Sequence, residues 1–169
     1  METRRGTHDD APAILATVAA GFESYREWAP AGWSPPEMTP AVLERLRKRL
    51  SDDEFWLLVA LDGGGMIGHV ALAPTTREEP APAPAGAIYL SQMFVRRRSH
   101  GSGVAATLMA AAIAEAARRG FTGMRLWTPR GAARARRFYE REGWSATGAV
   151  HARSPSGLPT VEYARAVER

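Results

Sequence analysis

The sequence predicts a mixed α/β fold in which residues 1–169 form one domain. Segments with apolar residues every three or four positions alternate with short runs rich in β-branched and aromatic residues, so both helices and strands are expected. A chain of 169 residues with 45% hydrophobic residues is long enough for one well-packed core. No internal repeat and no domain linker divides the chain.

The first half of the chain predicts two helices and up to three strands. The first helix carries acids and a proline, Asp9, Asp10 and Pro12, in its first turn, and Thr39-Pro40 begins the second. Asp62–Gly65 is typical of a hairpin turn. In chain order we expect a short strand at 2–6, a helix from residue 9, a proline-rich loop at 28–40, a helix from residue 39, and strands at 54–61 and 66–73.

The second half predicts strands that alternate with helices. Gly120 and Gly143 end the two helices. The buried side of the first of these helices is expected to carry Val104, Leu108, Ala112, Ile113 and Ala116. The expected elements are an exposed loop at 74–86, a strand at 87–95, a helix at 102–119, a strand at 123–128, a helix at 132–142, and strands near 144–152 and 159–167.

The composition excludes several classes of site. The chain has no cysteine, which rules out disulfides, thiolate zinc sites, iron–sulfur clusters and a cysteine nucleophile. No run reaches the roughly 18 apolar residues of a membrane span. Residues 1–6 lack the apolar run of a signal peptide. We therefore expect a cytoplasmic protein that has no membrane contact and no metal site.

Charge is distributed unevenly along the chain. Residues 1–79 carry a net charge of −5, and residues 80–169 carry +9. All basic residues except Lys48 are arginines, and alanine is also abundant, a joint bias that indicates a GC-rich genome more than a function. No nucleic-acid partner is expected, but the basic half of the chain suggests that the protein binds an anion.

A glycine turn between a strand and a helix is the most informative segment. It spans His100–Ala105 and follows three arginines at 96–98. Gly101 and Gly103 permit positive φ and a close approach of a ligand to the backbone. The free N–H groups and the dipole of the following helix suit a phosphate. Neither a P-loop nor the triple glycine of dinucleotide-binding folds is present.

A second motif at residues 132–144, Ala-Ala-Arg-Ala-Arg-Arg-Phe-Tyr-Glu-Arg-Glu-Gly-Trp, completes a pattern with the first. Together the two motifs resemble the GNAT N-acetyltransferase superfamily over residues 87–144. The family signature Arg/Gln-x-x-Gly-x-Gly/Ala corresponds to His100–Ala105, and the alternative register beginning at Arg98 keeps the literal pattern. His100 replaces the usual Arg or Gln, and Ala132 stands where an Asn is common.

The resemblance implies a fold, a donor and site residues. It implies a central mixed, mostly antiparallel sheet of about six to seven strands flanked by about four helices. Acetyl-CoA would be the acyl donor, and Tyr139 the general acid that protonates the departing thiolate. Pantetheine would pair with the strand end formed by Met93, Phe94 and Val95. The pyrophosphate would bind the turn amides of His100, Gly101, Ser102, Gly103, Val104 and Ala105.

The acceptor side is expected in the first two helices, their connecting loop and the late hairpin. The loop region combines aromatic and acidic residues, which suits a cationic amine. Its candidate substrate-binding residues are Glu23, Glu27, Trp28 and Trp33. Gln92 stands where the family often has an acid, which leaves a general base among Glu23, Glu27, Glu54 and His69, or a water relay.

These features predict an N-acetyltransferase that acts on a primary amine of a small molecule or a peptide. The acetyl group would pass directly to the amine in a ternary complex, and the protein would be a monomer or a homodimer. One alternative is a nucleic-acid-binding module that uses the arginines at 96–98, 130, 134, 136, 137 and 141. Another is a GNAT-fold protein that binds acyl-CoA without catalysis.

Overall fold

The computed structural model describes residues 1–76, 82–152 and 154–168. Its strands are β1 (Glu2–Arg5), β2 (Trp56–Asp62), β3 (Gly65–Ala73), β4 (Ala87–Val95), β5 (Gly123–Pro129), β6 (Ser145–His151) and β7 (Thr160–Ala166). Its α-helices are α1 (Ala11–Ser24), α2 (Pro40–Leu50), α3 (Val104–Arg118) and α4 (Ala133–Arg141). Short 3₁₀ turns lie at 8–10, 25–27 and 97–99.

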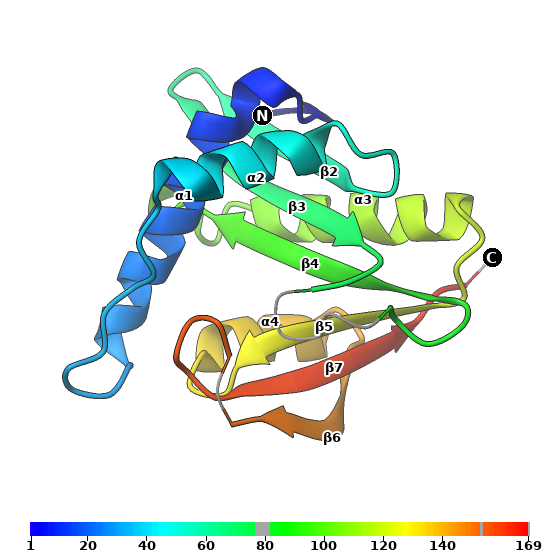
Figure 1. Cartoon of the computed structure of the whole chain (residues 1–169). Coiled ribbons are helices and arrows are strands. Elements are labelled where there is room, and N and C mark those ends of the chain that lie inside the picture. The colour runs from blue at the N-terminus through cyan, green and yellow to red at the C-terminus, as the bar shows by residue number, and fades with distance from the viewer. Residues whose placement is uncertain (77–81, 153, 169) are drawn as a thin grey trace.

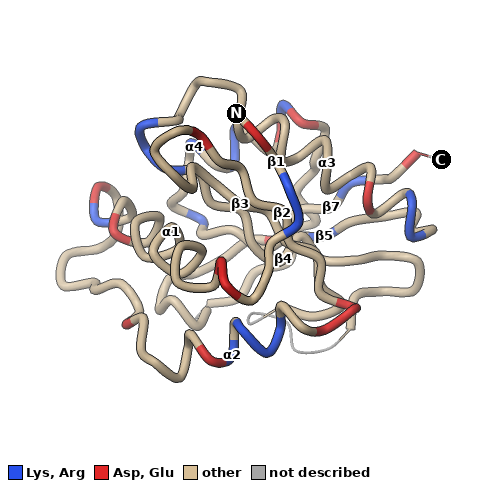
Figure 2. Tube along the Cα trace, turned by 90° about the horizontal axis from the view of Figure 1, so that it is seen from above, with Lys and Arg blue, Asp and Glu red and all other residues tan. Residues whose placement is uncertain are grey.

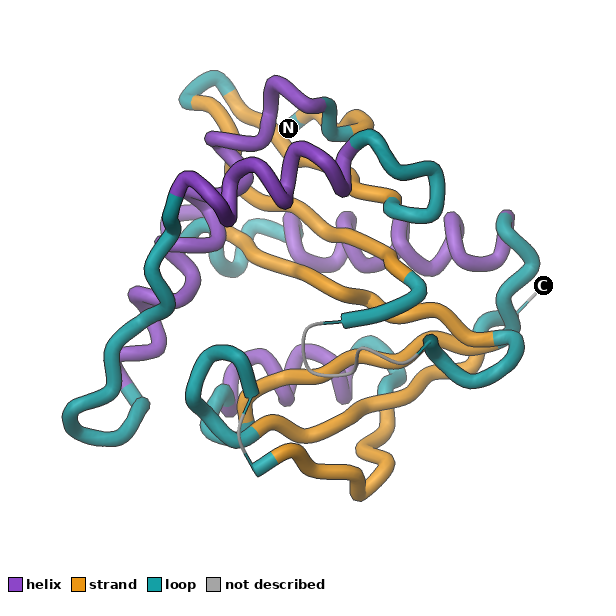
Figure 3. Tube along the Cα trace, in the orientation of Figure 1, coloured by secondary structure: helices purple, strands orange, loops and turns teal. Residues whose placement is uncertain are grey.

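The strands form one seven-stranded sheet in the order β1-β2-β3-β4-β5-β7-β6. Every neighbouring pair is antiparallel except β4 and β5, which are parallel. Helices α1 and α2 cover one face of the sheet, and α3 and α4 cover the other (Figures 1 and 3). The mixed, mostly antiparallel sheet with four α-helices confirms the predicted fold class.

Strands β4 and β5 pair along only part of their length. Their register joins Ala87–Tyr89 to Gly123–Arg125 and stops there. Beyond these pairs the two strands diverge and open the sheet (Figure 1). On the other side of β4, the register with β3 shifts so that Ser91 is an extra residue between the pairs of Leu90 and Gln92. Such a bulge increases local twist, which helps the end of β4 to leave β5.

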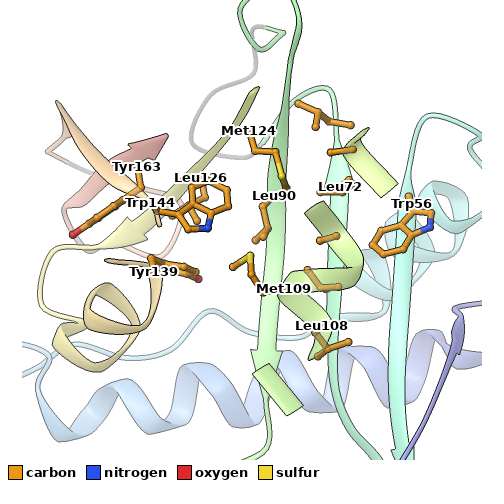
Figure 4. Close-up of a cluster of buried hydrophobic side chains, with 14 of the residues drawn as sticks. Trp56, Leu72, Leu90, Leu108, Met109, Met124, Leu126, Tyr139, Trp144 and Tyr163 are labelled. Carbon is orange, nitrogen blue, oxygen red and sulfur yellow. The ribbon is translucent and has the colours of Figure 1, made fainter. Parts of the chain in front are cut away.

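Two apolar cores hold the layers together. One lies between the sheet and α3 and continues to Tyr139 of α4 and Tyr163 of β7 (Figure 4). The other lies between α1, α2 and the opposite face of β2 and β3. Met109, which the predicted apolar stripe of α3 omitted, is fully buried, whereas Ile113 is half-buried. The first core crosses the opening, so both halves of the sheet depend on it.

The predicted element order is confirmed, with ends that differ from the structure by two residues or fewer. Thr39 Oγ1 accepts a hydrogen bond from Val42 N at 3.4 Å, which caps α2 as its Thr-Pro start predicts. Residues 77–81 of the predicted 74–86 loop lie outside the described residues. Within the described ranges, no helix has both the length and the apolar character needed to cross a bilayer.

A pH-dependent contact at the start of α1 gives a first test. The guanidinium of Arg4 binds both carboxylate oxygens of Asp10, at 2.7 and 2.8 Å, and Thr7 donates from its N–H and its hydroxyl. These donors, Arg4 first, lower the pKa of Asp10 to about 2. A lowered folded-state pKa stabilises the protein above the unfolded-state pKa, and this stability is lost as pH falls toward 2.

We therefore expect Asp10→Asn to lower the free energy of unfolding by about 1–2 kcal/mol at pH 7. This range is smaller than the shift in pKa alone would give, because solvent weakens the contact with the partly exposed Arg4. The difference from the wild type should shrink between pH 4 and pH 2. Urea denaturation across this pH range measures it. Asp9→Asn is the matched control, because the Asp9 side chain is 99% exposed. A difference that stayed constant with pH would contradict this assignment.

Candidate active site

A cavity of about 170 Å³ occupies the opening between β4 and β5. It is lined by both diverging strand ends, by the end of α1, by α4 and by the loop before β7. The lining residues are Val18, Phe22, Tyr25, Arg49, Thr76, Leu90, Ser91, Gln92, Met93, Phe94, Leu126, Trp127, Thr128, Pro129, Ala135, Tyr139, Pro155, Ser156 and Thr160. Most of these side chains are apolar or neutral, which suits a site that keeps water from a reacting group.

Tyr139 reaches this cavity from α4. Its ring is buried, and it packs edge-on to Phe138 and Trp144 and also against Tyr163. Its hydroxyl points from α4 toward β4 (Figure 4). Burial, together with the nearby Tyr25, raises the pKa of Tyr139, so the phenol stays protonated at neutral pH. The cavity therefore holds a neutral O–H donor in a fixed position.

The neighbouring Tyr163 anchors α4 against β7. Its hydroxyl donates to Glu140 Oε1 at 2.8 Å and accepts from Arg136 Nε at 3.0 Å. Both partners belong to α4, so these bonds fix the helix that carries Tyr139. Tyr163 is fully buried and does not line the cavity.

The glycine turn has the geometry expected of an anion site. Gly101 and Gly103 have φ of +81° and +86°, in the left-handed region that favours glycine. A Cβ at either position would meet no atom within 4 Å, so the space beside the turn is open. Gly103 caps α3 without a side chain, and the bond from Thr107 N to Gly103 O is the first of the helix. The backbone N–H groups of the first turn of α3, before Thr107, therefore lie outside the helical hydrogen-bond series and can bind an anion.

His100 ties this turn to the end of β4. Its Nε2 bonds to the carbonyl oxygen of Val95 at 3.0 Å, which requires the proton on Nε2. Burial lowers the pKa of His100, and the bond to Val95 offsets part of this effect. The charges of Arg134 and Arg97 lower the pKa further. Arg98, the first residue of the family signature in its alternative register, forms an ion pair with Asp62 in the β2–β3 hairpin at 3.1 Å.

Residues 93–95 form the diverging end of β4. Their backbone pairs with β3 along one edge, and the register with β5 has already ended. Met93 and Val95 pack against the core under α3, and Phe94 packs against the core under α1. The second backbone edge of this segment is therefore left without a strand partner, as the family resemblance implies.

The four predicted acceptor-side residues separate into two groups. The side chains of Glu23 and Glu27 are 60% and 58% exposed, and they pair with Arg26 and Arg97. Neither belongs to the described cavity lining. Figure 2 shows acidic and basic positions close together where the chain leaves α1. The structure thus leaves both glutamates at the surface.

The two tryptophans lie outside the described cavity lining, but they contact segments that flank it. Trp28 packs on Tyr25 with ring centroids 4.8 Å apart, and it lies so close to Gly131 that a Cβ there would come within 2.6 Å of the indole. Trp33 Nε1 donates to Ser156 O at 2.8 Å. The loop between α1 and α2 therefore contacts the segments before α4 and before β7.

The candidate bases do not line the cavity. His69 is fully buried, and neither ring nitrogen has a hydrogen bond of normal geometry to a described residue. Burial lowers its pKa to about 4, which the nearby Gln92 offsets only in part. Glu54 is exposed in the turn before β2. Gln92 does line the cavity, but its amide cannot take a proton.

Sequence reasoning missed Arg49, the charged member of the described lining. It follows Leu46 by three positions and so lies on the face of α2 that carries the apolar stripe. A cation on that apolar face was a sequence signal that could have identified Arg49 as a candidate site residue. The described residues contain no group of three or more acidic or histidine side chains placed to hold a metal ion.

Three of the eight arginines proposed for nucleic-acid binding have polar partners within the protein. Arg97 pairs with Glu27, Arg98 with Asp62, and Arg136 with the Tyr163 hydroxyl. These contacts reduce the charge available to a nucleic-acid backbone. No specific observation favours that alternative.

The sequence model of the acetyltransferase (GNAT) family matches residues 19–144. No curated protein sequence matches the chain significantly. Three solved structures share its fold, each below 25% identity and each covering at least 98% of both chains. They are a ribosomal-protein-alanine N-acetyltransferase from Brucella melitensis (21% identity, TM-score 0.75), an acetyltransferase of the GNAT family from Staphylococcus aureus (13%, 0.75), and the PaiA N-acetyltransferase from Thermoplasma acidophilum in complex with coenzyme A (14%, 0.71). The match with the Brucella structure covers 98% of this chain and 99% of that one. The match with the Staphylococcus structure covers 99% of both chains, and the match with the Thermoplasma structure covers 98% of both.

The positive φ of Gly103 gives a test of the turn. We expect Gly103→Ala to lower the free energy of unfolding by about 1–2 kcal/mol, because a Cβ is strained in this conformation although the space around it is open. Gly63→Ala is the matched control, since Gly63 also has open space but no positive φ, and it should change stability by less than about 0.5 kcal/mol. Equal losses in urea denaturation would contradict the strain argument.

Proposed function

The chain belongs to the GNAT family of acetyltransferases and is an N-acetyltransferase, and on this premise we propose that it transfers the acetyl group of acetyl-CoA to a primary amine of a small molecule or a peptide. The transfer is direct, within a ternary complex of enzyme, donor and acceptor. The observation that carries the proposal is that the end of β4, which β5 leaves unpaired, lies beside a cavity lined by Tyr139 and continues into a glycine turn at a helix start.

The donor would bind along the end of β4. The free backbone edge of Met93, Phe94 and Val95 offers hydrogen bonds to the amide groups of pantetheine. The amides from His100 to Ala105 offer donors to the pyrophosphate, and the left-handed glycines leave room for it. The coenzyme A complex of the similar Thermoplasma protein supports a donor of this class.

Transfer requires one bond to form and one to break. The neutral amine attacks the thioester carbonyl carbon, and the C–S bond then breaks with its electron pair on sulfur. Tyr139 would donate its proton to that sulfur, since it lines the cavity and a phenol is protonated at neutral pH. The amine loses its proton to water, because the described lining contains no carboxylate or histidine.

The acceptor would enter past the aromatic loop. Trp28 and Trp33 lie against the segments that flank the cavity, and Trp33 is held by its bond to Ser156. Glu23 and Glu27 have surface arginines as partners, and we assign them no role in the reaction.

Acetyl-CoA should raise the melting temperature of the protein. Ligand at about 100 times its dissociation constant adds about 2.7 kcal/mol to stability, which for a chain of this length corresponds to roughly 5–10 °C. S-Acetylcysteamine, which lacks the pyrophosphate, is the matched control and should give a much smaller shift. Thermal melts with each compound make the comparison. The absence of any shift at millimolar acetyl-CoA would contradict the proposal.

Tyr139→Phe should lower kcat by about 10²–10⁴-fold and leave the melting temperature close to that of the wild type, because it removes the proton donor and keeps the ring. Release of free thiol from acetyl-CoA measures the rate. Tyr163→Phe is the control: it removes a hydroxyl one ring away that does not line the cavity, so stability should fall while kcat changes by only a few fold. Unchanged turnover in Tyr139→Phe would exclude this role.

A further inference from the structure

Arg49 brings a positive charge into a cavity whose other described lining residues are neutral. It lies in the last turn of α2, on the opposite side of the opening from α4 and Tyr139. Its guanidinium carbon is 4.3 Å from the ring centroid of Phe55, which is buried. Figure 2 shows the basic end of α2 in which it lies.

Among the residues that the structure describes, this guanidinium has no anionic partner within bonding distance. No described residue forms an ion pair or a hydrogen bond with the side chain of Arg49, although Asp52 is close enough to exert a favourable field. The other basic residues of the same turn face differently: Arg47 pairs with Glu44 at 2.5 Å. A cation that is partly removed from water without a carboxylate partner is costly, so such an arrangement indicates a partner that arrives with a ligand.

The way Arg49 is held determines what it can bind. The guanidinium carbon lies over the ring of Phe55, and this contact restricts the position of the group. Its N–H groups form no hydrogen bond with a described residue, and their fork matches the two oxygens of a carboxylate. Because the surrounding lining is largely apolar, the attraction is screened less than it would be in water.

We propose that the acceptor carries a carboxylate in addition to the reacting amine, and that Arg49 binds this carboxylate. The substrate class is then a small amino acid or a similar amino-carboxylic acid. This inference rests on the proposed acetyl transfer. It also narrows the primary-amine acceptor expected from the sequence to one that carries a carboxylate, since Arg49 lies within the described lining whereas Glu23 and Glu27 lie outside it.

The experiment compares acceptors that differ in the carboxylate alone. Free-thiol release from acetyl-CoA is measured for L-amino acids and ω-amino acids and for their carboxamides, with rates expressed per neutral amine. The wild type should prefer the acids by at least about 10-fold in kcat/KM. Arg49→Gln should lower kcat/KM for the acids by about 10- to 100-fold, mainly through KM, and leave the amides unchanged. Arg49→Lys should retain part of the preference.

The matched control is Arg45→Gln, which removes the same charge from an exposed position of α2 that does not line the cavity. It should leave both classes of acceptor unaffected. A merely structural cation–π contact of Arg49 with Phe55 predicts a different pattern: Arg49→Gln would lower the melting temperature and slow the acids and the amides equally. That pattern, or equal turnover of acids and amides by the wild type, would overturn the inference and leave acetyl transfer in place.

A binding readout separates this inference from the proposed function. N-Acetyl amino acids and their amides are added together with coenzyme A, and the shift in melting temperature is compared in the wild type and in Arg49→Gln. A shift that is specific to the acids and lost in Arg49→Gln supports the carboxylate site even if no amine is acetylated, a result that would overturn the transfer alone. If neither binding nor transfer distinguishes the acids, the carboxylate site is overturned.

Discussion

The short parallel pairing of β4 with β5 is the constraint on which the rest of the structure depends. Three residue pairs join the two strands, and beyond them each strand end has one backbone edge without a strand partner. Buried backbone groups without partners are costly, so an opening of this kind persists where a ligand can supply the missing hydrogen bonds. The bulge at Ser91 supports the divergence, the cavity and Tyr139 border the opening, and the glycine turn follows the end of β4.

The opening persists because the two halves of the sheet are held together at other points. The core under α3 continues from Trp56 of β2 to Tyr163 of β7. On the other face, Trp33 binds Ser156. Contacts on both faces of the sheet therefore join the two walls of the opening, so the groups in the site need little reorganisation before they act.

The tertiary structure changes the interpretation of the charge difference between the two halves of the chain. The acidic first half supplies no acid to the described cavity lining, and Glu27 and Asp62 pair with arginines that follow β4. These pairs join the first half of the chain to the glycine turn. The charge inside the described cavity lining is the opposite one, on Arg49. The basic excess of the second half thus remains a prediction of an anion-binding region, and the acidic residues expected on the acceptor side, Glu23 and Glu27, lie outside the described cavity lining.

The sequence by itself determined the order of the elements, the left-handed glycines of the turn, the cap of α2 and the family, because periodicity, φ preferences and short motifs are local properties. Tyr139 was also found in this way, through a motif within one helix. Only the tertiary structure decided which side chains share the cavity. Arg49 and Tyr139 are 90 positions apart, and the exclusion of Glu23 and Glu27 depends on which arginines lie beside them. Such contacts depend on how the strands diverge and the helices pack, which no local pattern records.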